Sequence, residues 1–387
     1  MMIEIKGVQF VNKGAELMLH ACIEQIKAQW PDAEIVLTPD ANSPYLKRAQ
    51  LGAWQKLNLH KHVFDLNGLS YFLPHAFRRA LRRFGIVTEA DVDLVLDASG
   101  FAYGDSWPVR QLTHTSKQVQ RMALKGKPYI FLAQAFGPFT HPKLKHSIRS
   151  YWGSAALIVA RDTSSFDALS AILSHDAPLM RFPDFTNLLS PIIDEKLSPG
   201  VLVIPNSKMI SSKNQRKDWH ESYVNLLEEM CKAALASGKA ITLLNHDGGE
   251  DLALCNTLNE RLGGAATILS LECPLAVKAL ISKADGVVSS RYHGCVSALS
   301  QGVPTVGTSW SHKYEALFAD YGCSDMLFSS PSMMSTNAVM ARLLSDEYRD
   351  RCRTNPAIEE QKSLAREMWS SVFTVIASSV LTPGHRN

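Results

Sequence analysis

The chain has 387 residues, of which 46% are hydrophobic and 20% are charged. A single hydrophobic core stops growing at roughly 250–300 residues, so this length predicts two domains, and the composition excludes disordered, collagen-like and disulfide-scaffold proteins. The 40 basic and 37 acidic residues leave a net charge of +3. That excess is too small to indicate a duplex nucleic-acid partner, whereas an anionic small molecule needs only a local site.

The seven cysteines are scattered, without a C-x-x-C pair or a paired metal-ligand spacing, which indicates a reducing compartment and no metal site. The N-terminal residues run directly into a strand pattern and lack the basic start and apolar core of a secretory signal. No stretch approaches the roughly 18 uninterrupted apolar residues of a spanning helix. We therefore expect a soluble, cytoplasmic protein.

Short apolar runs alternate with longer helix-like segments through the first half of the chain. The runs that predict strands are 3–10, 35–38, 94–96, 129–132, 157–159 and 179–181, and the segments that predict helices are 14–29, 112–125, 143–152 and 166–173. This alternation is typical of βα units around a mainly parallel sheet. Residues 1–190 are therefore expected to form a Rossmann-like N-terminal domain.

The second half repeats the pattern. Strands are predicted at 201–204, 241–244, 266–269, 286–288 and 305–307, and helices at 219–237, 250–262, 274–282 and 294–300. The stretch 187–200, with Pro191, Pro199 and Gly200, has no sheet pattern and is the predicted linker. Residues 197–345 would then form a second Rossmann-like domain, and residues 346–387 a helical tail that, by analogy with two-domain α/β transferases, packs back on the first domain.

A basic segment interrupts the first domain. Residues 73–84 read LPHAFRRALRRF, with four arginines set against Phe77, Leu81 and Phe84 at helical spacing. One interpretation is an amphipathic helix that rests on anionic lipid. The alternative is a solvated helix packed on its own domain, because one short basic helix is a weak membrane signal.

In an open α/β sheet, ligands bind beyond the carboxyl ends of the strands, so the residues after each predicted strand are the candidates for a site. In the first half they comprise a turn with a cation, a glycine-containing loop with a hydroxyl and a carboxylate, and an amide, namely Asn12, Lys13, Ser99, Gly100, Asp105 and Gln134. The loop at 97–107 has the residue types of a sugar site. A plain strand-to-helix turn at 11–16 and a capping role for Asp97 are the alternatives.

In the second half, the segment Ser289–Gly294 carries the densest group of reactive side chains. The guanidinium of Arg291 can hold a carboxylate or phosphate, and His293 can move a proton near neutral pH. A purely structural histidine is the alternative. Ser207 and Lys208 follow another predicted strand, and Lys313 lies in the loop after the strand at 305–307.

Together these segments resemble the polysaccharide pyruvyltransferase family, whose architecture is similar to that of two-domain glycosyltransferases of the B type. The most specific match is S-S-R-Y-H-G at 289–294, followed by A-L-S-Q-G-V-P at 298–304 and the loop with Lys313. Two positions depart from the family pattern. Ala15 replaces an acid in the first turn, and Lys208 is the nearest cation where the family often carries an arginine.

The resemblance implies transfer of pyruvate from phosphoenolpyruvate onto a sugar of a polysaccharide or its precursor, as a cyclic ketal, with release of phosphate and no other cofactor. His293 would be the catalytic acid or base. The donor would contact Arg291, Tyr292, Ser207, Lys208 and Lys313 on the C-terminal side of an active site between the halves, while the N-terminal candidates would face a saccharide acceptor, free or lipid-linked.

Two alternatives stay open. A glycosyltransferase or epimerase of the same architecture would use a nucleotide sugar, but the second half shows no distinctive acid pair for a ribose. A catalytically idle sugar-binding homologue is favoured by Ala15 and disfavoured by the presence of both Arg291 and His293.

Overall fold

The computed structural model describes residues 1–61, 64–191, 197–212, 214, 216–309 and 311–381. The chain forms two compact units. Unit 1 contains Met1–Phe10, Met18–Phe185 and the chain from Leu364 onward, and unit 2 contains Val11–Leu17 and Thr186–Ser363. The predicted linker at 187–200 falls partly on residues 192–196, outside the described residues, and the predicted domain boundaries stay predictions.

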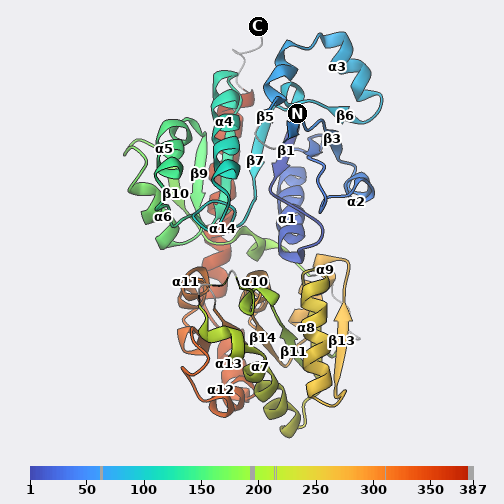
Figure 1. Ribbon diagram of the computed structural model, residues 1–387, viewed down its shortest axis with the longest axis vertical. Coiled ribbons are helices and arrows are strands. Elements are labelled where there is room, and N and C mark those ends of the chain that lie inside the picture. Colours follow the sequence, from blue (N-terminus) through green and yellow to red (C-terminus); the bar gives the residue numbers. More distant parts are fainter. Residues whose placement is uncertain (62–63, 192–196, 213, 215, 310, 382–387) are drawn as a thin grey trace. The chain divides into compact units, whose positions relative to one another are not determined.

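Unit 1 is built on an eight-stranded sheet in which all neighbouring strands are parallel (Figure 1). The strands in spatial order are β10 (Leu179–Arg181), β9 (Leu157–Ala160), β8 (Tyr129–Gln134), β7 (Leu94–Asp97), β1 (Met2–Lys6), β2 (Glu34–Leu37), β3 (Trp54–Lys56) and β6 (Ile86–Val87). The chain builds outward from β1 to β6 and then returns to β7 on the other side of β1. This reversal makes the carboxyl ends of β1 and β7 a topological switch point, where open α/β sheets bind ligands.

Helices flank this sheet because its central strands are buried on both faces. They are α1 (Lys13–Gln29), α2 (Tyr45–Gln50), α3 (His75–Arg82), α4 (Val109–Leu124), α5 (Pro142–Tyr151), α6 (Thr163–Ser170) and the last part of α14 (Ala357–Ile376). Short 3-10 helices lie at η1 (Asn67–Phe72), η2 (Glu89–Asp91), η3 (Trp152–Ser154) and η4 (Phe185–Leu188), and the π-helical turn η7 (Ala377–Leu381) follows α14. Strands β4 (His60–Lys61) and β5 (Phe64–Asp65) form a separate antiparallel hairpin. Aromatic rings fill the core, where Phe131 stacks on Trp152 at 4.5 Å.

The C-terminal helix contributes aromatic residues to unit 1. Trp369 is 1% exposed and meets the edge of Phe185 at 5.8 Å, and Phe373 meets Trp30 at 5.3 Å. These aromatic contacts pack the chain after Leu364 against the rest of unit 1.

Unit 2 has a six-stranded parallel sheet of the same kind. Its order is β13 (Ala266–Ser270), β12 (Ile241–Asn245), β11 (Val201–Ile204), β14 (Gly286–Ser289), β15 (Thr305–Thr308) and β16 (Leu327–Phe328). The helices are α7 (Asp218–Ala236), α8 (Gly248–Arg261), α9 (Pro274–Ser282), α10 (Tyr292–Leu299), α11 (Lys313–Asp320), α12 (Thr336–Leu343) and α13 (Asp346–Arg353), with turns η5 (Ser207–Met209) and η6 (Ser324–Met326). Here the switch point lies between β11 and β14.

The predicted α/β fold with two mainly parallel sheets is confirmed, and the differences lie at element ends. The first strand was predicted over 3–10 but ends at Lys6, because Gly7 turns the chain with a φ of +79° and passes so close to Ser99 that a β-carbon would lie 2.0 Å from its Oγ. Strand β3 and the edge strands β6 and β16 were missed. The edge strands have two residues each, and β3 reads WQK without an apolar run, so none of them carries a recognisable strand pattern.

None of the helices among the described residues is both long and apolar enough to cross a lipid bilayer.

Candidate active site

Buried polar side chains fix the strand exits at the switch point of unit 2. Ser290 follows β14, and its Oγ accepts hydrogen bonds from Tyr223 at 2.5 Å and Thr308 at 2.7 Å. The Ser290 carbonyl accepts from the Asn206 side chain after β11 at 2.9 Å and from Tyr314 at 2.8 Å. Hydrogen bonds with all partners buried give the loops after β11, β14 and β15 a defined geometry.

Arg291 is the N-cap residue of α10 and is 5% exposed. Its guanidinium donates from Nε and Nη2 to both oxygens of Asp251, at 2.8 and 2.5 Å, and from Nη1 to Asp247 at 2.5 Å. Burial opposes the charge, but Asp251 and Asp247 outweigh it and raise the pKa of Arg291. The fork therefore joins the exit of β14 to the start of α8, and three of its five N–H groups bind these two carboxylates among the described residues.

The carboxylates that bind Arg291 come from the loop at 247–251. Nothing in the spacing of these acids along the chain connects them with Arg291, which lies 40 positions after Asp251. Asp251 is fully buried and also accepts from the backbone N–H of Ser207 at 3.0 Å. The loops after β11, β12 and β14 thus share one charged centre.

His293 lies in the first turn of α10 and is half-buried. It packs against Gly14, where a β-carbon would lie 2.3 Å from Nδ1 of the imidazole. Any side chain at position 14 would collide with the ring. The edge of the imidazole also meets Tyr292 at 5.4 Å, so two neighbours set the ring's position.

The first predicted turn reaches the same centre. Asn12 accepts hydrogen bonds from the backbone of Gly14 and Ala15 at 2.9 and 3.2 Å, and its amide donates to Asp247 at 2.9 Å. Lys13 donates to Glu16 at 2.7 Å and to the carbonyl of Glu272 at 2.6 Å. The structure thus brings Asn12 and Lys13, expected on the acceptor side, together with the predicted donor residues in unit 2.

Gly294 lies where α10 packs closely on β14. A β-carbon there would lie 2.5 Å from Oγ of Ser289, so the glycine permits this close packing.

Two further predicted donor-side cations, Lys208 and Lys313, belong to unit 2. The side chain of Lys208 is partly exposed to solvent. Desolvation of its ammonium group and the positive charge of Arg291 lower its pKa. Lys313 is 8% exposed and opens α11, with Nζ 5.2 Å from the ring centre of Tyr292. The hydroxyl of Ser207 reaches Glu250 at 3.4 Å.

His246 belongs to this centre and was not predicted. It is 4% exposed, and burial together with the charges of Arg291, His293 and Lys13 lowers its pKa well below the ordinary histidine value. Its backbone carbonyl accepts from the Lys13 N–H at 3.3 Å. Its position directly after a predicted strand was the one signal that could have identified it.

In unit 1, the candidates Ser99 and Gln134 both bind Asp97, which is fully buried, and the carbonyl of Gly100 accepts from the Ala135 N–H at 2.8 Å. Ser99 donates from its hydroxyl to Asp97 at 2.5 Å, and the Gln134 amide donates to the Asp97 carbonyl at 3.1 Å. Tyr103 and Tyr129 donate to the second carboxylate oxygen, each at 2.6 Å. Asp97 therefore anchors the strand exit, beyond the capping role considered from the sequence.

Asp105, which was expected to face a sugar, instead binds backbone. Its carboxylate accepts from the N–H of Thr140 at 2.8 Å and of His141 at 3.3 Å. Slight burial acts in the opposite direction, but these bonds lower the pKa of Asp105. The structure shows a loop-fixing role for this side chain.

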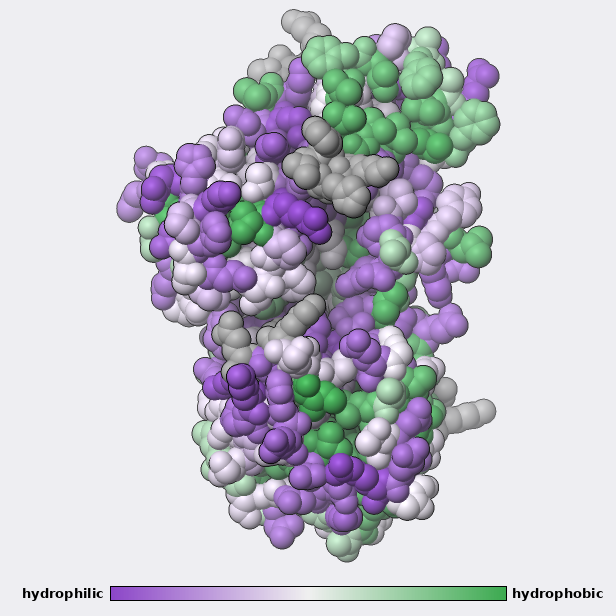
Figure 2. All heavy atoms as spheres, in the orientation of Figure 1, coloured by the Kyte–Doolittle hydropathy of each residue, from purple (hydrophilic) through white to green (hydrophobic). Residues whose placement is uncertain are grey.

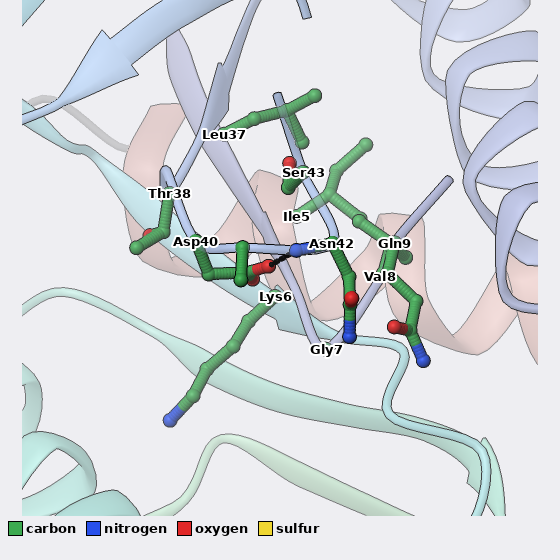
Figure 3. Close-up of a pocket in the computed structure, with 11 residues that line it drawn as sticks. Ile5, Lys6, Gly7, Val8, Gln9, Leu37, Thr38, Asp40, Asn42 and Ser43 are labelled. Atoms are coloured by element: carbon green, nitrogen blue, oxygen red, sulfur yellow. Dashed lines mark hydrogen bonds between the residues drawn. The ribbon is translucent and has the colours of Figure 1, made fainter. Parts of the chain in front are cut away.

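Unit 1 has two polar pockets at the carboxyl end of β1. One of about 390 Å³ lies between the loops after β1 and β2, and Figure 3 shows the amide ends of Gln9 and Asn42 pointing the same way from those loops. A second of about 510 Å³ shares Lys6 with the first and extends past Ser99 to Arg110 and Gln111 of α4. Lys6 was also missed; its Nζ donates to Thr115 and Gln118 at 2.9 Å.

Among the described residues there is no cluster of three or more His, Cys, Asp or Glu side chains suited to a metal ion.

Three solved structures similar to this chain have descriptions that name UDP or a UDP-sugar. A putative UDP-N-acetylglucosamine 2-epimerase of Listeria monocytogenes matches 99% of this chain and 97% of its own, with 10% identity and a TM-score of 0.62. The UDP-GlcNAc 2-epimerase of Neisseria meningitidis, bound to UDP-GlcNAc, covers 96% and 99% with 11% identity and a TM-score of 0.58. HepE of Anabaena, in complex with UDP and glucose, covers 97% and 99% with 13% identity and a TM-score of 0.57.

At such low identity these likenesses establish the fold alone, which is that of B-type glycosyltransferases and epimerases. No curated protein matches the sequence at a significant level. The sequence does match the family described as polysaccharide pyruvyl transferase, over residues 12–312. That range begins at Asn12 and includes Arg291, His293, Asp247 and Asp251, and Lys313 follows its last residue directly. The chain belongs to the polysaccharide pyruvyl transferase family.

Proposed function

We propose that the protein transfers the pyruvyl group of phosphoenolpyruvate onto two hydroxyl groups of a saccharide and releases phosphate. The observation that carries this proposal is the family match over residues 12–312 together with His293 and Arg291 at the switch point of unit 2. A buried guanidinium and two lysines beside a half-exposed imidazole suit a small donor that carries both a carboxylate and a phosphate and must also accept a proton.

The reaction needs one protonation and two hydroxyl additions. His293 delivers a proton to C3 of the enol, which makes C2 electron-poor, and a saccharide hydroxyl adds to C2. The C2–O bond to phosphate then breaks, and the second hydroxyl completes the ketal. Of the two hydroxyl protons, one replaces the proton placed on C3 and the other leaves with phosphate, so atoms and charge balance.

In this proposal, different cations of unit 2 bind different anionic groups of the donor. The guanidinium of Arg291 binds its carboxylate or phosphate, and Lys208 and Lys313 neutralise the charge that develops on the leaving phosphate. Asp247 and Asp251 hold the guanidinium in place. An arginine fixed by two carboxylates needs no reorganisation during the reaction, which is the condition for efficient electrostatic stabilisation.

In this proposal, the saccharide binds in a pocket of unit 1. The pocket of about 510 Å³ offers amide, hydroxyl, ammonium and guanidinium groups, including those of Ser99, Arg110 and Gln111. Sugars are bound by several such groups placed around one cavity.

Phosphate release and NMR together test the proposal. The purified protein is incubated with phosphoenolpyruvate and a panel of saccharides, and carbon NMR follows the ketal methyl group. A new ketal signal that appears with phosphate supports pyruvyl transfer. The fold likeness to UDP-sugar proteins supplies the competing outcome, in which a UDP-sugar is consumed while phosphoenolpyruvate is not.

A further inference from the structure

The segment from η1 through α3 exposes an unusual number of large apolar side chains. Phe72 is 84% exposed, Phe84 78%, Leu69 54%, Phe77 52% and Leu66 48%. These five residues lie within 19 consecutive positions of unit 1, and Figure 2 shows the hydrophobic surface gathered over α3. Apolar side chains this concentrated on a surface mark an interaction site.

Charge in this segment has one sign. Between Asp65 and Glu89 the sequence contains four arginines and neither aspartate nor glutamate. Arg78 and Arg82 both bind the buried carboxylate of Asp91 at 3.0 Å, which fixes one side of α3 to the body of unit 1. The remaining arginines, Arg79 and Arg83, are exposed.

The outward side of α3 is ordered by residue type. At 100° per residue, the exposed positions of α3 span one arc, with arginines toward one edge, alanines in the middle and a phenylalanine at the other edge, in the order Arg82, His75, Arg79, Ala76, Ala80 and Phe77. Arg83 and Phe84 follow in the turn after the helix and are also exposed. Phe72 protrudes just before the helix begins. A helix with an aromatic edge and an arginine edge fits the boundary between acyl chains and phosphate headgroups.

We infer that residues 66–84, here called the Phe/Arg face, dock the protein on an anionic phospholipid bilayer. Phe72, Phe77 and Phe84 insert below the headgroups, while Arg79 and Arg83 bind lipid phosphates. A bilayer matches the face better than a protein partner, because the exposed side chains protrude and every exposed charge is positive. The inference is independent of the proposed reaction.

Vesicle co-sedimentation of the full chain tests this inference. One set of vesicles contains phosphatidylcholine alone, and the other contains phosphatidylcholine with about 30 mol% phosphatidylglycerol, which gives the surface a strong negative charge. Binding is expected to the anionic vesicles and to fall when salt rises from about 0.1 to 1 M, because the screening length falls from roughly 10 to 3 Å. Arg79→Glu with Arg83→Glu should weaken binding at least about 25-fold, from roughly five-fold for each arginine lost. Phe72→Ser with Phe84→Ser should abolish it.

Matched controls come from other exposed positions. Leu46→Ser removes an apolar side chain that is 72% exposed on α2, and Arg353→Glu reverses an exposed charge of unit 2; neither should change vesicle binding. Equal binding to neutral vesicles, no binding to anionic ones, or binding unchanged by the Phe/Arg face variants would overturn the inference. So would a dimer in sedimentation velocity that Phe72→Ser with Phe84→Ser dissociates while vesicle binding is absent.

Discussion

Gly14 and His293 are in direct contact: a β-carbon on Gly14 would lie 2.3 Å from Nδ1 and 3.0 Å from Cβ of the histidine. Gly14 lies in the first turn of α1, with a φ outside the left-handed region, so the helical backbone does not require glycine at this position. Glycine is required because the imidazole of His293 occupies the space that a side chain would fill.

Gly14→Ala should therefore separate activity from stability. Alanine favours a helix over glycine by up to about 1 kcal/mol, which offsets part of the cost of moving the imidazole, so the melting temperature should change little. The displaced imidazole should lower pyruvyl transfer at least about ten-fold, as expected when a proton-transfer group loses its position. Gly249→Ala is the control, because it also lies in a first helical turn, that of α8, and has open space around it. Equal activity of the two variants would contradict the contact's importance.

His293→Gln tests the proton-transfer role directly. Loss of a general acid or base lowers turnover by about 10²–10⁴-fold. Because His293 is half-buried, the free energy of unfolding should change little. His175→Gln, at a fully exposed histidine, should leave turnover unchanged. A His293→Gln enzyme with wild-type turnover would remove this residue from the mechanism.

Arg291→Ala should destabilise unit 2. The substitution leaves Asp251, which is fully buried, without its bidentate partner, and breaking a buried pair costs about 3–5 kcal/mol. Denaturant unfolding measures this change. Arg349→Ala breaks a pair with Asp346, which is exposed, and should cost less than about 1 kcal/mol. Similar costs for both variants would mean that the Arg291 pair does not hold the loop.

His246 should make stability depend on pH. Its pKa is lowered in the folded protein by burial and by Arg291, His293 and Lys13, so below about 6.5 the unfolded chain binds a proton that the folded chain does not. This contribution is fully present above about pH 6.5 and is lost as pH falls, at up to about 1.4 kcal/mol for each pH unit. Unfolding measured from pH 7.5 to 5 should show a shallower decline for His246→Gln. Parallel curves would contradict the assignment.

Substitutions in the proposed saccharide pocket of unit 1 should weaken saccharide binding without weakening donor binding. Arg110→Ala with Gln111→Ala should raise the KM for the saccharide about ten-fold or more, since each lost hydrogen bond to a ligand costs roughly 1 kcal/mol or more, while phosphoenolpyruvate binding stays unchanged. Arg149→Ala, at an exposed arginine on α5, should alter neither. An unchanged saccharide KM would exclude this pocket.

The sequence predicted the fold well because parallel strands buried on both faces read as short apolar runs. Val201–Ile204 and Pro274–Ser282 were predicted with the bounds that the structure shows. The edge strands β6 and β16, with two residues each, carry no such pattern. Local periodicity therefore identified the central elements and missed those defined only by their neighbours in the sheet.

The site was predictable only where its residues follow strands. Arg291 and His293 stood out by position and residue type, but the carboxylates that fix Arg291 and the glycine that accommodates His293 are connected to them through space alone. Asp105 shows the reverse case. Its residue type suited a sugar, yet its carboxylate caps the backbone at Thr140, a partner 35 positions away that spacing could not reveal.

Calorimetric titration of the protein with phosphoenolpyruvate and, separately, with UDP and UDP-sugars distinguishes a pyruvyl transferase from a nucleotide-sugar enzyme. We expect that phosphoenolpyruvate binds, that UDP does not, and that Arg291→Lys, which keeps the charge but loses the bidentate fork, weakens phosphoenolpyruvate binding. Binding of UDP or a UDP-sugar with no heat from phosphoenolpyruvate would contradict this expectation and indicate a nucleotide-sugar enzyme.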